Sequence, residues 1–278
     1  MFDLSSRQAK TGFVLALLFI GFFLFFPLYW LVISSLKGNA ELYRVVPTPI
    51  PTMPTLEHFI TALTKGKLPM YLMNSLITSG ASACLVTVLA LYAGFSFAKY
   101  RYFGRQPVML FMLSAQMFPF GLLLISIYPL MGQLNLLDTR LGLILSYIVF
   151  ALPVSTYMLY SYFSQVPDEL IDAARADGAS DLRIFHTIVI PISVPPIVTV
   201  FLYSFMWSWN DLLYSMTIIA SDDKRTIGPG LLLTYLNEVN SDWGGAMAGS
   251  LIASVPIVLA FMFLQRYFIQ GVTAGAVK

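Results

Sequence analysis

The sequence has few charged residues. Asp, Glu, Lys and Arg make up 11% of its 278 residues, less than half of the roughly 25% that is usual in soluble globular domains. Hydrophobic residues make up 58%, and the mean hydropathy is +0.76. Because a soluble surface needs many more charges, this composition indicates a multi-pass membrane protein. The net charge of +2 gives no indication of nucleic-acid binding.

Residues that build disulfides, metal sites and catalytic centres are also scarce. The single cysteine, Cys84, excludes an intrachain disulfide and most simply packs between helices. The two histidines, His58 and His186, are far apart in the sequence, so no metal site is expected. There is no G-x-x-x-x-G-K-[ST] motif, and the chain therefore cannot bind ATP as a P-loop protein does. We expect no enzyme activity, and the energy for any active transport must come from another chain.

Six apolar stretches are long enough to cross a bilayer, which takes about 20 residues of helix. They cover residues 12–33, 72–98, 107–131, 141–163, 187–219 and 246–268. The fifth is too long for one straight span and contains Pro191, Pro195 and Pro196, so we expect its first turns to be kinked or to lie outside the hydrocarbon. The sequence therefore predicts an all-α integral membrane protein, with six transmembrane helices in a single domain over residues 1–278.

Lysine and arginine in the short loops predict the orientation. Residues 99–106 hold Lys99, Arg101 and Arg105, whereas the loop at 132–140 holds only Arg140. This distribution favours a cytoplasmic location for both termini and for the loops at 99–106 and 164–187. The long loop at 37–71 has four basic residues, but long loops count less in this rule. Its prolines at 47, 49, 51 and 54 favour an extended strap on the outer face.

One polar stretch, PDELIDAARADGASDLRIFHTIVIP at residues 167–191, does not look like membrane. Pro167 can open a helix, and Asp168 and Glu169 would lie in its first turn, where carboxylates are favourable. Alanines follow until Gly178 turns the chain. Such a helix can lie close in the groove of a partner, although an ordinary solvated loop helix explains the pattern equally well. The stretch contains five carboxylates and two arginines, namely Asp168, Glu169, Asp172, Asp177, Asp181, Arg175 and Arg183.

The same stretch resembles the cytoplasmic coupling loop of ABC-importer permeases, whose motif is E-A-A, three residues, G, nine residues, I-x-L-P. Here Asp172-Ala173-Ala174 precedes Gly178 at that spacing, and Ile188-Val189-Ile190-Pro191 closes the motif. Asp172 replaces the usual glutamate and Ile190 the usual leucine; the shorter aspartate can reach a different partner atom. The resemblance implies that this loop docks into an ATP-hydrolysing subunit and transmits its closure to the membrane helices. The implied coupling residues are Glu169, Asp172, Ala173, Ala174, Asp177, Gly178 and Ala179.

Two further segments narrow the resemblance to the carbohydrate-importer permeases of the MalG-like branch, namely WSWNDLL (Trp207–Leu213) and QRYFIQGVTAGAVK (Gln265–Lys278). FAKYRYFGR (Phe97–Arg105) and PDEL (Pro167–Leu170) also resemble segments of the family. The resemblance implies a type I ABC importer permease (MetI-like) fold in the bacterial inner membrane, with a cytoplasmic tail at 269–278 that reaches the ATPase. It also implies a second permease subunit, two ATPase subunits and an extracytoplasmic sugar-binding protein. No cofactor or metal is expected in this chain, because ATP and Mg would bind to the partner ATPase.

Aromatic and polar residues in the fifth stretch form a candidate substrate pathway. Tyr203, Trp207, Asn210 and Tyr214 are spaced at i, i+4, i+7 and i+11, so one helix would place them on a shared face. Asp211 follows Trp207 by four residues and is a candidate gate or helix anchor. Aromatic surfaces beside hydrogen-bonding groups suit a sugar. The structural alternative is that the aromatic residues lie at bilayer interfaces and that the asparagine joins helices.

A carbohydrate importer permease is therefore the predicted function. A permease for another polar solute, such as a polyol or glycerol phosphate, is the closest alternative, because aromatic and amide groups suit many hydroxylated compounds. A stand-alone secondary transporter is less favoured, since only Asp211 is a plausible intramembrane charge and proton-coupled transporters usually contain several.

Overall fold

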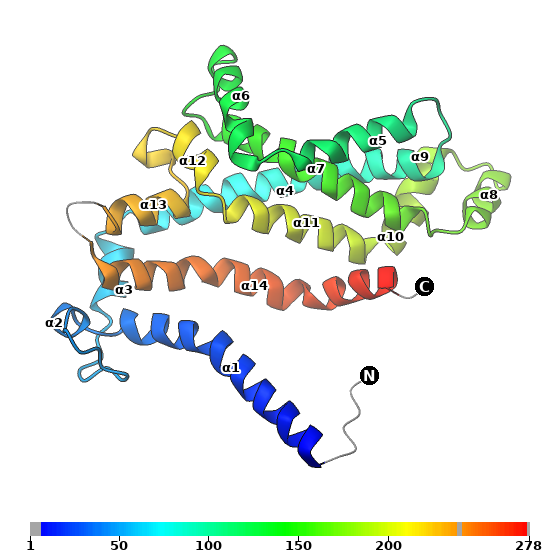
Figure 1. Ribbon diagram of the computed structural model, residues 1–278. Coiled ribbons are helices and arrows are strands. Elements are labelled where there is room, and N and C mark those ends of the chain that lie inside the picture. Colours follow the sequence, from blue (N-terminus) through cyan, green and yellow to red (C-terminus); the bar gives the residue numbers. More distant parts are fainter. Residues whose placement is uncertain (1–6, 238–240, 277–278) are drawn as a thin grey trace. The chain divides into compact units, whose positions relative to one another are not determined.

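The protein is built from helices. The structure, a computed structural model, describes residues 7–237 and 241–276 (Figure 1). Within these ranges the only extended pairing is an isolated antiparallel bridge between Leu236 and Ser241. The main helices are α1 (Arg7–Ser35), α2 (Asn39–Leu42), α3 (Glu57–Thr64), α4 (Leu68–Lys99), α5 (Arg105–Ser114), α6 (Phe120–Gln133), α7 (Arg140–Phe163), α8 (Asp168–Ala176), α9 (Asp181–Ile184), α10 (Ile190–Ile192), α11 (Val194–Trp209), α12 (Leu213–Ile218), α13 (Ile227–Tyr235) and α14 (Trp243–Ala276).

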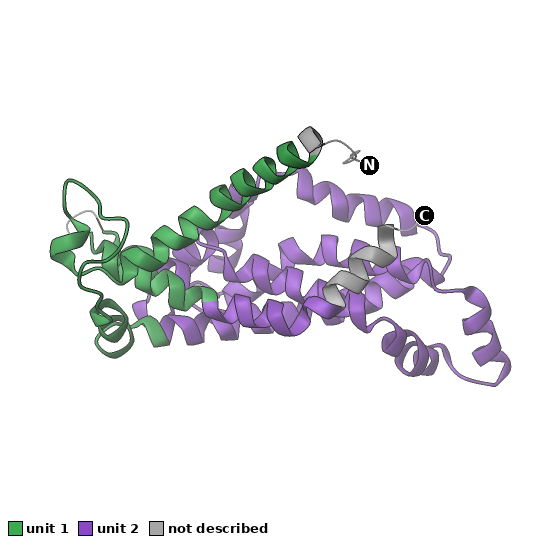
Figure 2. Cartoon of the chain, turned by 90° about the horizontal axis from the view of Figure 1, so that it is seen from below, with its two compact units in different colours: residues 1–69, 231–254 green, residues 70–230, 255–278 purple. Residues whose placement is uncertain are grey.

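The chain falls into two compact units, which Figure 2 shows in different colours. One contains residues 1–69 and 231–254, and the other contains residues 70–230 and 255–278. The larger unit holds both regions singled out by the sequence, the polar stretch at 167–191 and the aromatic stripe that begins at Tyr203.

Within the described ranges, four helices are long and apolar enough to span a membrane, and two bent helix pairs bring the candidate spans to the predicted six if each pair forms one span. The continuous spans are Lys10–Ser35, Leu68–Lys99, Arg140–Phe163 and Trp243–Arg266. The first bent pair joins Arg105–Met117 to Phe120–Gln133 at 105°, and the second joins Asp181–Ile192 to Val194–Trp209 at 80°. The all-α fold is thus confirmed, whereas the third and fifth stretches are not continuous helices.

Proline explains both breaks. Pro119 disfavours helical backbone at the preceding residue, and Phe118 is extended, with φ −74° and ψ 135°. In the second pair, Ser193 separates α10 from α11 and lies between Pro191 and Pro195. The predicted kink near these prolines is confirmed. The fifth helix also ends earlier than predicted, at Trp209, and α12 begins four residues later.

Helix α7 packs along α11 in the larger unit, and it also contacts α5 and α12. Gly94 lets α4 approach α7 closely, because a Cβ there would collide with the side chain of Leu159 and the backbone of Tyr160. Phe95, Phe163 and Phe185 form an aromatic cluster near one end of these helices, with the rings of Phe95 and Phe185 4.7 Å apart.

In the smaller unit, a buried carboxylate organises the proline-containing strap. Glu41 accepts hydrogen bonds from the hydroxyls of Thr48 and Thr52 and from the backbone N–H of Thr52. Close to it, the Lys37 ammonium donates to the carbonyl of Thr48. The hydrogen bonds from Thr48 and Thr52 lower the pKa of Glu41 from 4.5 to about 2. Its charged form therefore stabilises the strap fully above pH 4.5, and this contribution is lost as the pH falls toward 2.

Replacing Glu41 with glutamine is expected to loosen the strap at neutral pH. A glutamine amide nitrogen cannot accept a hydrogen bond, so at least one donor of Thr48 or Thr52 loses its acceptor. Hydrogen exchange of residues 43–53 at pH 7 should be several-fold faster in Glu41→Gln than in the parent chain. The parent should approach the variant only well below pH 4.5. Equal exchange in the two proteins at pH 7 would contradict this role of Glu41.

Small residues allow close packing at the start of α14. Gly244 lies against the imidazole of His58, and Gly245 against the ring of Tyr235, with no room for a Cβ at either position. Gly249 contacts Leu231 in the same way. These contacts explain why the sequence has a cluster of small residues here.

Candidate functional site

The polar stretch forms the predicted short helix. Helix α8 begins after Pro167 and carries Asp168 and Glu169 in its first turn. Gly178 has a φ of +82°, a left-handed conformation that favours glycine. This turn lets the N–H of Ala179 donate to the carbonyl of Ala174 over 3.0 Å and closes the end of the helix. Sequence reasoning thus located both ends of the helix.

One side of α8 is packed and the other is uncovered. Ile171 is buried in the aromatic cluster, together with Ile184 and Phe185 of the following helices. Ala174 and Ala179 are half-buried against the same cluster. The remaining five predicted coupling residues are exposed in this chain, namely Glu169, Asp172, Ala173, Asp177 and Gly178.

Ion pairs connect α8 to the end of α4. The Lys99 ammonium lies 2.6 Å from Asp168 and also donates to the carbonyl of Val166. Arg175 pairs with Asp181 at 2.9 Å, and the Tyr100 hydroxyl donates to the same carboxylate over 2.9 Å. The Asp168 side chain and both side chains of the Arg175–Asp181 pair are exposed, and ion pairs at exposed groups contribute little, about 0–1 kcal/mol each. Burial of apolar side chains therefore provides most of the attachment, and these pairs orient the helix.

These partners also hold the carboxylates in their charged form. Lys99 lowers the pKa of Asp168, and Arg175 followed by Tyr100 lowers the pKa of Asp181. A lowered pKa means that the pairs persist throughout the neutral range. They are lost only as the pH falls below the ordinary value of 3.8 toward the lowered pKa.

Asp172, which stands where the coupling motif has glutamate, is paired within the loop. Its carboxylate accepts a hydrogen bond from Arg175 over 3.2 Å, and its side chain remains 69% exposed. The shorter side chain is thus held against its own helix. Lys99 and Tyr100 were not among the predicted site residues, although both lie in the FAKYRYFGR segment.

A short π-helical segment joins this loop to the membrane helix α11. Residues Phe185–Val189 form the π-helix, with Phe185 and Val189 buried. The imidazole of His186 is hydrogen-bonded to the Leu182 carbonyl at 2.8 Å and to the Tyr92 hydroxyl at 3.1 Å. The connection is therefore anchored by the buried side chains of Phe185 and Val189, whereas His186 and Thr187 are exposed.

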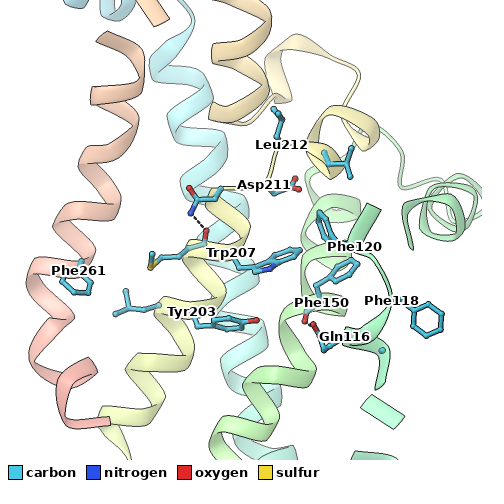
Figure 3. Close-up of a pocket in the computed structure, with 14 residues that line it drawn as sticks. Gln116, Phe118, Phe120, Phe150, Tyr203, Trp207, Asp211, Leu212 and Phe261 are labelled. Carbon is cyan, nitrogen blue, oxygen red and sulfur yellow. Dashed lines mark hydrogen bonds between the residues drawn. The ribbon is translucent and has the colours of Figure 1, made fainter. Parts of the chain in front are cut away.

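A cavity of about 950 Å³ lies beside α11 (Figure 3). The Trp207 indole stacks on Phe150, with ring centroids 5.3 Å apart and planes 17° apart. Phe120 meets the same indole edge-on at 4.9 Å.

Two amides, Gln116 and Asn210, add polar groups to this aromatic wall. Gln116 donates to the Phe150 carbonyl over 2.9 Å and Asn210 to the Met206 carbonyl over 2.8 Å, while their amide oxygens have no partner among the described residues.

Four of the five predicted pathway residues line this cavity: Tyr203, Trp207, Asn210 and Asp211. Tyr214 does not, and its predicted place on the same helical face is wrong. Because α11 ends at Trp209, Tyr214 belongs to α12, where it is fully buried and its hydroxyl donates to the Phe120 carbonyl over 3.1 Å. Sequence reasoning missed Phe120 and Phe150, since nothing in their own segments indicates that they meet Trp207.

Asp211 anchors the helix that follows it. Its carboxylate accepts from the N–H groups of Tyr214 and Ser215, over 3.2 and 2.9 Å, and from the Tyr147 hydroxyl over 2.9 Å. The residue is only 8% exposed. Of the two roles predicted for Asp211, gate and helix anchor, these contacts favour the second.

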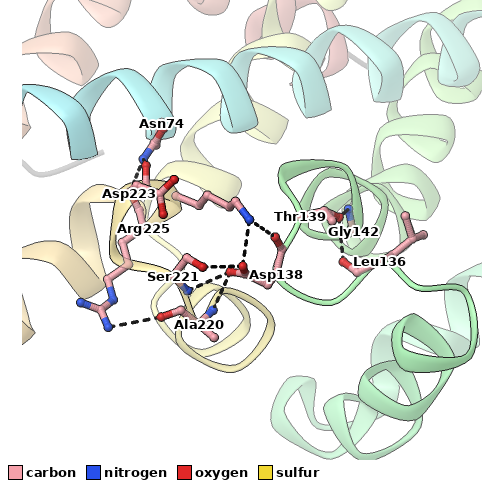
Figure 4. Close-up of polar contacts among 10 residues, drawn as sticks. Asn74, Leu136, Asp138, Thr139, Gly142, Ala220, Ser221, Asp223 and Arg225 are labelled. Carbon is pink, nitrogen blue, oxygen red and sulfur yellow. Dashed lines mark hydrogen bonds and ion pairs between the residues drawn. The ribbon is translucent and has the colours of Figure 1, made fainter.

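A polar cluster holds the far end of α12 (Figure 4). Asp138 accepts from the N–H groups of Ala220 and Ser221, over 3.1 and 2.8 Å, and pairs with Lys224 at 2.8 Å. Lys224 and Ser221 hold the pKa of Asp138 far below its usual range. Asn74 donates to two carbonyls of the same turn. Helix α12 is thus held at both ends beside the cavity.

Comparison with known proteins identifies the family. The family model described as "binding-protein-dependent transport system inner membrane component" matches residues 86–274, which include α8 and all the cavity residues named above. The chain is 34% identical over 263 residues to the arabinooligosaccharides transport system permease protein AraQ of Halalkalibacterium halodurans, covering 94% of this chain and 93% of AraQ. It is 31% identical over 261 residues to the diacetylchitobiose uptake system permease protein DasC of Streptomyces coelicolor, covering 94% of each.

The fold of this chain is also found in a solved structure of a transporter. The chain is similar to a chain in the crystal structure of a bacterial ABC transporter involved in the import of the acidic polysaccharide alginate, with a TM-score of 0.83 and 20% identity. The similarity covers 96% of this chain and 99% of the other. Members of the matched family are membrane-spanning transport subunits that work with ATPase and solute-binding partners. With its membrane-spanning helices and these matches, the chain belongs to the family of binding-protein-dependent transport system inner membrane components, the permease subunits of ABC importers.

Proposed function

We propose that this chain is the permease subunit through which a carbohydrate, delivered by an extracytoplasmic binding protein, crosses the bacterial inner membrane. The cavity beside α11 carries the proposal. Its aromatic wall suits the apolar faces of a sugar ring, and the free amide oxygens of Gln116 and Asn210 suit its hydroxyl edges. The names of AraQ and DasC, which refer to oligosaccharide and disaccharide uptake, support the same class of solute.

The charge of the cavity argues against glycerol phosphate. Among the described residues that line it, Asp211 is the only charged side chain, and no lysine or arginine is present. A phosphate ester would meet a carboxylate and no cation, which is unfavourable in a partly apolar site. A polyol remains the nearest alternative, although it lacks the flat ring that would use the Trp207–Phe150 wall.

The exposed side of α8 is proposed to dock into the ATPase subunit, through Glu169, Asp172, Ala173, Asp177 and Gly178. Ala174 and Ala179 would hold the helix against this chain. Closure of the ATPases would move α8, and the packed π-helical segment would pass this movement to α11, which carries Trp207. The cavity would then alternate between outward-facing and inward-facing states.

The proposed assembly has a second permease subunit and two ATPase subunits, which bind ATP and Mg. We place both termini and the loops at 99–106 and 164–187 in the cytoplasm, and we treat residues 1–278 as one permease domain. The proposed tail at 269–278 extends beyond the described residues. Reliance on a separate ATPase disfavours both a stand-alone secondary transporter and an enzyme.

Uptake by the reconstituted importer tests the solute class. We expect proteoliposomes containing the assembled transporter and its binding protein to accumulate a radiolabelled disaccharide, such as diacetylchitobiose or arabinobiose, and not glycerol 3-phosphate. Trp207→Ala should reduce this uptake about tenfold, because it removes the stacking surface. Trp207→Phe should retain most of it, and Trp243→Ala, which lies outside the cavity, should leave it unchanged. Accumulation of glycerol 3-phosphate alone, or full uptake by Trp207→Ala, would contradict the proposal.

A further inference from the structure

A second, smaller pocket lies between α4 and α5. It has a volume of about 480 Å³ and is formed by residues 101–107, including Arg101, Phe103 and Arg105. Gly104 has a φ of +88°, and this left-handed turn brings two arginines four residues apart in sequence to one pocket. Neither the cavity beside α11 nor the surface of α8 uses this pocket.

The arginines of this pocket are not neutralised by the chain itself. Arg101 is exposed and has no hydrogen bond or ion pair with any described residue. Arg105 donates to the carbonyl of Tyr100 over 3.1 Å and has no described ion pair. The positive charge of Arg101 contributes, after Lys99, to lowering the pKa of Asp168, but this carboxylate is already paired with Lys99 at 2.6 Å. The pocket therefore presents net positive charge.

The position of the pocket restricts what can reach it. It joins two membrane-spanning segments, and a loop of this length between them must lie at the membrane surface. Phe103 is fully exposed. The first turns of α5 continue this apolar surface with exposed Val108 and Phe111. The two arginines, which have no described ion pair, lie beside the exposed Phe103 and the apolar first turns of α5. This arrangement matches a phospholipid, whose charged headgroup adjoins apolar acyl chains.

We propose that residues 101–107 bind the headgroup of an anionic phospholipid. The lipid phosphate would be held by Arg101 and Arg105, whose planar guanidinium groups suit phosphate oxygens. Phe103 would contact the glycerol and upper acyl region. The site rests on the proposed cytoplasmic location of the loop, because anionic lipids are abundant in that leaflet. An acidic protein surface would satisfy the arginines but would leave Phe103 and the apolar start of α5 without a partner.

Native mass spectrometry of the assembled importer in detergent tests this site, with phosphatidylglycerol and phosphatidylcholine of identical acyl chains as probes. We expect the parent to retain phosphatidylglycerol preferentially. Arg101→Gln should weaken this binding about fivefold and Arg101→Gln with Arg105→Gln about thirtyfold, since each arginine contributes a similar factor near a lipid surface. Binding of phosphatidylcholine should not change. Arg183→Gln removes another exposed arginine, which lies outside the pocket, and should have no effect.

Three outcomes would overturn the proposal. The first is equal retention of phosphatidylglycerol by Arg101→Gln and Arg183→Gln. The second is displacement of the lipid by millimolar glycerol 3-phosphate, which would indicate a site for small phosphate esters. The third is loss of the ATPase from Arg101→Gln in detergent without anionic lipid, which would indicate a protein contact. Arg101 makes no described internal bond, so its replacement should not unfold the chain. Lipid retention requires no transport, so a failure of carbohydrate uptake would leave this result unaffected.

Discussion

Replacing Gly178 with valine is expected to reduce transport-coupled ATP hydrolysis by the assembled importer at least tenfold. The φ of +82° at this position is costly for any L-residue with a Cβ, by about 1–2 kcal/mol, and more so for a β-branched one. A Cβ here would meet no neighbouring atom, so the effect arises from the backbone and not from a collision. The turn would open, and the hydrogen bond from Ala179 to Ala174 that closes α8 would be lost.

The matched variant Gly178→Asn separates backbone conformation from side-chain size. Asparagine adopts the left-handed conformation more readily than other residues with a Cβ, so it should retain much of the coupled activity. The measurement is ATP hydrolysis stimulated by the loaded binding protein, with complex assembly followed by size-exclusion chromatography. Normal coupling in Gly178→Val would refute the proposed role of this turn. Equal losses in both variants would instead indicate that the ATPase requires an uncovered backbone at residue 178.

Replacing Asp211 with alanine is expected to destabilise the permease by about 3 kcal/mol. The change leaves the N–H groups of Tyr214 and Ser215 and the hydroxyl of Tyr147 without an acceptor in a buried position. A lost helix cap costs about 0.5–2 kcal/mol and each buried unsatisfied donor about 1–3 kcal/mol, with partial relief by water from the cavity. Thermal unfolding of the purified complex should shift downward by roughly 6–10 °C.

Two further variants assign this loss to the contacts of the carboxylate. Tyr147→Phe removes one donor, while the Asp211 carboxylate keeps its hydrogen bonds from the N–H groups of Tyr214 and Ser215, so it should cost only about 1 kcal/mol. Asp177→Ala removes an exposed acid and should change stability by less than about 0.5 kcal/mol. If Asp211→Ala unfolded at the parent temperature and lost only transport, Asp211 would act on the solute and not as an anchor.

The two largest expected effects lie at opposite ends of the proposed coupling path. Gly178 shapes the helix proposed to receive the movement of the ATPase, and Asp211 fixes the helix beside the proposed solute cavity. Between them run the π-helix at 185–189, the 80° bend at Ser193 and the helix α11. Because each of these elements is packed against α4 or α7, movement at one end would require repacking along the path, which suits switching between two discrete states.

The sequence by itself determined the features that depend on local composition and backbone conformation. A stretch of some 20 apolar residues must form a helix in lipid, so six spans could be counted. Pro167 and Gly178 set the ends of α8 through their own φ preferences, and the missing phosphate loop predicts that ATP hydrolysis takes place on another chain. The carboxyl-rich loop was recognisable because all of its motif residues are close together in the sequence.

Only the tertiary structure decided how distant segments combine. Continuous hydrophobicity could not reveal that α11 ends at Trp209, which removed Tyr214 from the cavity wall. The partners of Trp207, namely Phe120 and Phe150, come from other helices, and their stacking depends on how those helices pack. Asp211 became an anchor because the chain turns there and brings two N–H groups and Tyr147 within hydrogen-bonding distance. Such contacts arise between elements, and no single segment of sequence encodes them.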